Sequence, residues 1–116
     1  KGRVVGVIPF TGEQDGTPWW HDTDAVLIEG ESGVIVYGEI TAHPDLKLGD
    51  MVKAGQILGQ VKTVLKKDKG RPMSMLHLEF HKYGTRQPQE WAVGQSKPKT
   101  LQDPTPLLKR VRPYKL

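Results

Sequence analysis

The 116-residue sequence contains no cysteine. Disulfide bonds are therefore excluded, and so are thiolate metal sites, which leaves histidine and carboxylate side chains as ligands for any zinc ion. The sequence also lacks an apolar run long enough to cross a bilayer, and its first residues do not resemble a signal peptide. A chain of this length forms one domain at most.

The net charge of +4 is gathered in two clusters. The first cluster lies within residues 62–71 and the second within residues 109–115. Either cluster could meet nucleic acid, anionic lipid or an acidic wall polymer. Neither shows the alternation of basic and aromatic residues that base stacking favours. We therefore expect a solvated turn and a solvated tail, and no nucleic-acid partner.

Thirteen glycines and nine prolines separate short apolar runs. This texture favours many turns and little helix. The β-branched runs at residues 4–8, 25–29 and 34–40 predict strands, and the Gly-Glu-Ser-Gly sequence at residues 30–33 predicts a hairpin. Gly49 and Gly55 predict two sharp corners between further short strands. The sequence therefore predicts an all-β fold of antiparallel sheets.

Residues 11–24 form a long polar loop in this prediction, carrying Trp19, Trp20 and His21. Long loops in small domains are often functional. Exposed paired tryptophans are typical of contact surfaces, so these residues are candidates for a binding groove. The alternative is a hydrophobic lid over the sheet. For His21 and the aspartates that follow it, a turn is favoured over a metal site.

Residues 75–81 alternate strictly between apolar and other side chains. As a strand, this segment would present Leu76, Leu78 and Phe80 to one face, which we predict to be the core. The opposite face would carry four further side chains, Met75, His77, Glu79 and His81. Histidine and carboxylate two residues apart can share a metal ion or a proton. The alternative is an edge strand whose outer face is exposed to solvent and has no functional role.

A second strand is predicted to contribute to the same place. In residues 34–40, Val34, Val36 and Ile40 share one face, which leaves Tyr37 and Glu39 on the other. We therefore expect Glu39 to lie on the same side of the sheet as His77.

From residue 84 onward the composition changes to Gln, Pro, Lys and Gly, which predicts a domain over 1–83 and an irregular extension with a basic tail over 84–116. Residues 103–108 could open a short helix.

Residues 48–59 resemble the hammerhead turn of duplicated hybrid-motif β folds. That group includes biotinyl and lipoyl carriers, sugar-phosphotransferase carriers and the lysostaphin-type (LytM-like) zinc endopeptidases of bacterial cell walls. The flanking residues 34–40 and 74–80 resemble the peptidases in order and spacing, as do residues 1–7 and 101–108. The carriers' modified-lysine signatures are not found after Gln60. The resemblance therefore favours the peptidases.

The resemblance implies a zinc site of which this chain keeps one clear member. His77 matches the second His of the family's H-x-H motif and is the candidate metal ligand. Met75 stands where the first His is expected, and Glu39 stands where an assisting His is expected, so Glu39 is the candidate catalytic base. The family's H-x-x-x-D motif would precede Lys1. We therefore expect a missing N-terminal segment or a second chain to complete the sheet, and an open edge near residues 3–8.

Two functions follow from the resemblance. The first is a zinc metallopeptidase-like domain, a hydrolase acting on peptidoglycan peptide cross-bridges, incomplete or inactive as given. The second is a pseudoenzyme, a non-catalytic module that binds cell wall or serves as a scaffold in a larger envelope or phage-tail protein. Both imply an extracellular, cell-envelope or virion-associated location.

Overall fold

The computed structural model describes residues 2–18, 20–62, 76–88 and 99–105. The prediction of an all-β fold is confirmed, because these residues form one antiparallel sheet and a single turn of 3₁₀ helix, η1. The elements are β1 (Gly2–Thr11), η1 (Glu13–Asp15), β2 (Thr23–Gly30), β3 (Gly33–Ala42), β4 (Met51–Val52), β5 (Gly59–Val61), β6 (His77–His81) and β7 (Leu101–Gln102).

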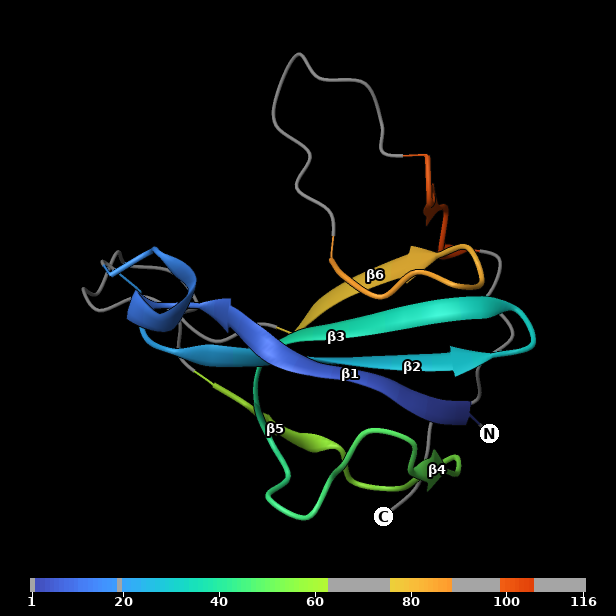
Figure 1. The fold of residues 1–116 in the computed structure, drawn as a ribbon, viewed down its shortest axis with the longest axis horizontal. Helices are drawn as coiled ribbons and strands as arrows, with labels where there is room; N and C mark the ends of the chain where they lie inside the picture. Colours follow the sequence, from blue (N-terminus) through green and yellow to red (C-terminus); the bar gives the residue numbers. More distant parts are fainter. Residues whose placement is uncertain (1, 19, 63–75, 89–98, 106–116) are drawn as a thin grey trace.

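The strands follow the order β4-β1-β2-β3-β6-β7, and β5 pairs with the far end of β3. Figure 1 shows β1, β2, β3 and β6 side by side, with β4 and β5 set apart in a smaller lobe. The predicted glycine corners of this lobe are confirmed, since Gly49 (φ 89°) and Gly55 (φ 83°) both adopt the left-handed backbone that glycine favours. The lobe corresponds to the residues that resemble a hammerhead.

The predicted hairpin joins β2 to β3. Gly30 pairs with Gly33 across a two-residue turn, and the ladder continues along both strands. The ladder is interrupted near its end, where Asp24 pairs with Ile40 but Val26 pairs with Tyr37. One residue of β2 therefore faces two of β3, which makes a β-bulge. Such a bulge changes the direction of the side chains that follow it.

Apolar side chains are buried on both faces of the sheet. Val26, which pairs with Tyr37, is completely buried on one face, and the hydrophobic core cluster lies on the other, which we call the front face. It contains Ala25, Leu27, Val34 and Val36, all fully buried. In β6, His81 pairs with Val34 and Glu79 pairs with Val36. Paired residues share a face, so the polar side chains of β6 lie on the core side of the sheet.

This arrangement corrects the predicted faces of residues 75–81. His81 is completely buried, whereas Leu76 is 50% exposed. Leu78 is half-buried and Phe80 is buried on the opposite face. The prediction that Leu76, Leu78 and Phe80 face the core is therefore confirmed for Phe80 only, and the prediction that the histidine face is the open one is wrong for His81. Alternation was right about which side chains share a face, but the burial of each face depends on what packs over it.

The opposite face, called the back face, forms the floor of an open groove of about 1100 Å³. Ile28, Ile35, Tyr37 and Phe80 line the sheet side of this groove, and residues 51–56 and Leu58 line its other side. Burial raises the pKa of the Tyr37 hydroxyl. This groove therefore lies on the other side of the sheet from the polar side chains of β6.

The outer edge of β1 is partly covered. Gly2 and Arg3 pair with β4, and the Val4 amide donates a hydrogen bond to the Asp50 carbonyl at 2.8 Å. The predicted open edge is therefore wrong at residues 3 and 4. Among the described residues, no strand pairs with the rest of that edge.

The extension after residue 83 contributes to the sheet through β7, which pairs with β6. The Asp103 carboxylate accepts a hydrogen bond from the Thr105 amide at 2.9 Å, as an N-cap would. The rest of the helix predicted over 103–108 lies outside the described residues. In the parts of the chain that the structure describes, we find no helix with the length and apolar character of a membrane span.

Candidate functional site

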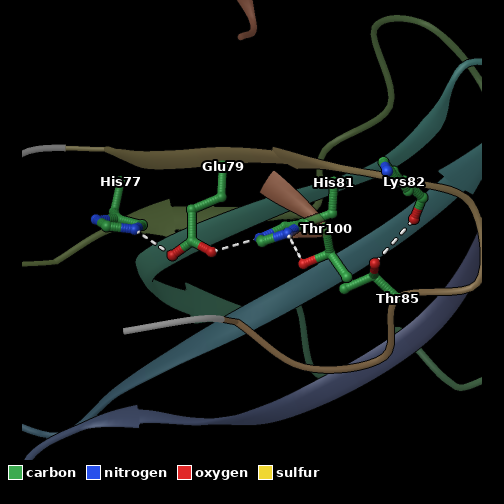
Figure 2. A network of polar contacts seen from close by, with 6 residues as sticks. All are labelled: His77, Glu79, His81, Lys82, Thr85 and Thr100. Atoms are coloured by element: carbon green, nitrogen blue, oxygen red, sulfur yellow. Dashed lines mark hydrogen bonds and ion pairs between the residues drawn. The ribbon is translucent and has the colours of Figure 1, made fainter. Parts of the chain in front are cut away.

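Four side chains on the front face form a continuous hydrogen-bonded row (Figure 2). His77 Nε2 lies 2.6 Å from Glu79 Oε2, and Glu79 Oε1 lies 2.7 Å from His81 Nε2. His81 Nδ1 lies 2.8 Å from Thr100 Oγ1. The first three residues belong to β6, and the fourth, Thr100, immediately precedes β7. One carboxylate is thus shared by two imidazoles.

The local sequence explains how the row is built. Residues 77, 79 and 81 point to the same face because side chains alternate along a strand. Thr100 is brought to them by the chain's return, since the Lys82 amide donates to the Thr100 carbonyl at 2.7 Å and His81 pairs with Leu101. The row therefore depends on the β6–β7 pairing as well as on the spacing within β6.

The chemistry of the groups gives the row a direction. An ionised carboxylate only accepts hydrogen bonds, so His77 Nε2–H donates to Glu79 Oε2 and His81 Nε2–H donates to Glu79 Oε1. Neutral His81 then has an acceptor at Nδ1, and the Thr100 hydroxyl donates to it. Neutral His77 has its lone pair at Nδ1, and no described group bonds to that nitrogen. Of the four imidazole nitrogens in the row, His77 Nδ1 is the one without a partner among the described residues.

The His77 imidazole lies between aromatic and charged neighbours. Its ring centroid is 5.0 Å from that of Phe10, and it faces Gly38 across the strand pair. A Cβ on Gly38 would come within 2.8 Å of the Phe10 ring, so glycine leaves space for the ring. The hydrogen bond to Glu79 raises the pKa of His77, although partial burial opposes it.

Glu39 is the second predicted member of the site. It is the one non-glycine residue with a positive φ among the described residues, at 60°, and it lies in the bulge next to Gly38. Partial burial raises the pKa of the Glu39 carboxyl, and the nearby charge of His77 partly opposes this. Glu39 in turn raises the pKa of His77. The two groups are thus close enough to interact electrostatically, with Glu39 held in an unfavourable backbone conformation.

Replacement of Glu39 by glycine is expected to increase the free energy of unfolding by about 1 kcal/mol, because the left-handed backbone strains an L-residue but not glycine. Urea denaturation measures the change. Glu39→Gln keeps the strain and serves as the control, with stability within about 0.5 kcal/mol of the wild type. A loss of stability in Glu39→Gly would show that the carboxylate stabilises the fold more than its backbone strains it.

Stability is expected to depend on the protonation of His77. Its pKa is higher in the folded chain than the value of about 6.5 in unfolded peptides. The protonated form is therefore favoured by folding, and this stabilisation is complete below about pH 6.5 and is lost as the pH rises through the folded pKa. Denaturation midpoints measured across that interval should fall in the wild type. The fall should disappear in His77→Ala and persist in His43→Ala, which removes an exposed histidine elsewhere.

Of the other predicted groove residues, the structure describes Trp20, His21, Tyr37, Glu79 and His81. Tyr37 pairs with Leu78 and lies on the back face, so its predicted place beside His77 is wrong. Trp20 is half-buried and His21 is exposed in the β1–β2 connection, where the His21 carbonyl accepts a hydrogen bond from the Thr11 hydroxyl. Trp19 and Met75 lie outside the described residues. Glu79 and His81 are in the row.

Two contributors were missed from the sequence. Thr100 and Phe10 lie far from β6 in the chain, and neither belongs to a recognisable motif. No local signal could have found Thr100, because its role depends on the return of the chain beside β6. Phe10 could have been suspected from Gly38, since a glycine within a strand often marks the close approach of another group.

The donor chemistry of the site suits zinc in kind but not in number. Imidazole and carboxylate are zinc ligands, and a carboxylate on the second ring nitrogen is the usual partner of a ligating histidine. His77 has that partner in Glu79 and keeps Nδ1 open. However, among the residues that the structure describes, no group of three or more histidine, aspartate or glutamate side chains could hold a metal ion. His77 fits a metal ligand, whereas the described set is too small for a catalytic zinc.

Compared with protein-family models, with curated proteins and with solved structures, the chain matches none of them.

Proposed function

We propose that this chain is a domain of the lysostaphin-type zinc endopeptidase kind in which His77 is retained as a preoriented metal ligand. One observation carries the proposal: the 2.6 Å hydrogen bond from His77 Nε2–H to Glu79. That bond fixes both the tautomer and the ring orientation, so that Nδ1 presents its lone pair. A solvent-exposed histidine on an edge strand would instead form its hydrogen bonds with water, and its ring orientation would not be fixed.

His77 and Glu39 are the residues that would hold a zinc ion within the described set. Zinc, when bound, supplies a Lewis acid that polarises a carbonyl and lowers the pKa of a bound water. Glu39 would contribute an oxygen ligand or accept the proton of that water. The interaction between Glu39 and His77 supports this pairing. Because catalytic zinc takes three protein ligands, the described residues alone would bind zinc weakly and would not hydrolyse peptides.

The substrate proposed for a completed site is the peptide cross-bridge of peptidoglycan, with an extracellular, envelope or virion-associated location. This proposal rests on the resemblance of residues 34–40, 48–59 and 74–80 to the peptidases. The second candidate is the non-catalytic wall-binding or scaffolding module. The observation in its favour is the small number of metal donors among the described residues, which would suit a fold that has kept the architecture without the hydrolysis.

Calorimetric titration with zinc distinguishes the two candidates. We expect the 116-residue chain to bind one zinc ion weakly, and His77→Ala to weaken binding at least about tenfold, since even an outer partner of a metal ligand contributes about 10–100-fold. His43→Ala is the matched control, because it removes an exposed imidazole away from the site. Equal binding by the wild type and His77→Ala would contradict the proposal. An absence of binding, together with sedimentation on purified cell walls, would favour the module.

A further inference from the structure

We propose that His81 and Thr100 are positioning residues that keep His77 Nδ1 open toward a divalent cation of the zinc type, acting through Glu79. This inference rests on the proposed function, in which His77 is a metal ligand. His81 lies outside the segment that resembles the peptidase motif, and Thr100 lies 19 residues further along the chain. Neither side chain hydrogen-bonds to His77 directly, so both would act through Glu79.

Burial makes this part of the row rigid. The His81 side chain is fully buried and the Glu79 side chain is 11% exposed, whereas His77 is 39% exposed. Polar groups buried away from water need partners, and both ring nitrogens of His81 have them. No described buried side-chain nitrogen or oxygen lacks a partner. A fully satisfied buried network is rigid, and it supports the more exposed His77.

The directions of the hydrogen bonds give His81 a specific task. The Thr100 hydroxyl donates to His81 Nδ1, which keeps the proton of neutral His81 on Nε2. That proton is donated to Glu79 Oε1, and Oε2 accepts the hydrogen bond from His77. Without the donor at Oε1, the carboxylate loses one of the hydrogen bonds that orient it, and the His77 ring is held less firmly. The open nitrogen of His77 would then be less well fixed in its place.

Thr100 also links the site to a distant segment. Its carbonyl accepts from the Lys82 amide at 2.7 Å while its hydroxyl bonds to His81 at 2.8 Å. The same residue is therefore held by backbone and side chain beside the end of β6; Figure 2 shows the bond of its hydroxyl to His81. A change in the pairing of β7 would thus reach the metal ligand without any contact to the metal.

The test is the tautomer of His77, measured by long-range ¹H–¹⁵N NMR on the full chain without metal, at a pH where both imidazoles are neutral. In the wild type we expect the Nε2–H form of His77. Thr100→Val removes the hydroxyl at nearly constant volume and should increase the Nδ1–H population of His77. Thr100→Ser should restore the wild-type spectrum. His81→Leu should increase the Nδ1–H population of His77 more than Thr100→Val does. If His81→Leu does not fold, Thr100→Val alone provides the test.

Zinc affinity gives a second readout. His81→Leu should weaken zinc binding about tenfold, at the lower end of the effect of outer-shell partners, and Thr100→Val should weaken it roughly threefold. An unchanged His77 tautomer in Thr100→Val and His81→Leu would overturn the positioning role, even if both variants were less stable. A wild-type Nδ1–H tautomer would overturn it too. Because the tautomer is read without metal, a chain that binds no zinc but shows the expected shifts would refute the proposed function alone.

Discussion

Replacement of Glu79 by alanine is expected to lower the free energy of unfolding by about 3 kcal/mol. The substitution leaves the buried His81 Nε2–H without an acceptor and releases His77. Loss of one member of a buried charged pair costs about 3–5 kcal/mol, and the lower value applies because the His77 end is partly exposed. Chemical denaturation at neutral pH measures the effect.

The controls for this prediction separate charge from burial. Glu79→Gln keeps the shape and one acceptor, so a loss of about 1–2 kcal/mol is expected. Glu31→Ala removes an exposed carboxylate in the β2–β3 turn and should change stability by less than about 0.5 kcal/mol. If Glu79→Ala were as stable as Glu31→Ala, the row would not be a stabilising network.

Replacement of Gly33 by alanine is expected to destabilise the fold by about 3 kcal/mol. Gly33 begins β3 with a φ of 138°, a conformation that strains any L-residue. A Cβ at this position would also overlap the backbone carbonyl oxygen of His81 on the neighbouring strand. Because that oxygen belongs to the backbone of β6, relief requires the two strands to separate, and strain adds to overpacking.

Gly16 offers a matched control for this substitution. It also has a positive φ, at 78°, but an added Cβ would meet no atom within 4 Å. Gly16→Ala should therefore cost only the backbone strain, about 1 kcal/mol. Thermal denaturation of both variants gives the comparison. Equal losses at the two positions would mean that the contact with His81 contributes nothing.

Local patterns in the sequence predicted much of the strand framework. The β-branched runs became β1, β2 and β3, and the glycines at the hairpin and corners took the conformations that such turns require. These features depend on residues close together in the chain. The return of β7 beside β6 could not be predicted in the same way, because its two residues carry no distinct signal.

The candidate site shows the same limit in more detail. The spacing of residues 77, 79 and 81 predicted a shared face, but the buried state of that face follows from its pairing with Val34 and Val36. Tyr37 lies on the face opposite Val36, as a period of two predicts, and it is separated from His77 because β3 and β6 pair in the register that puts Val36 beside Glu79 and Gly38 beside His77; the sequence does not specify that register. Thr100 completes the row through tertiary pairing alone.

The preorientation of His77 is tested most directly by adding zinc to the ¹⁵N-labelled chain and following the two ring nitrogens of that residue. We expect the Nδ1 resonance to shift with zinc while the Nε2 proton stays in its hydrogen bond to Glu79. A zinc-dependent shift at Nε2 with loss of that proton, or no response of His77 at zinc concentrations that perturb the rest of the spectrum, would contradict the assignment of His77 as a metal ligand.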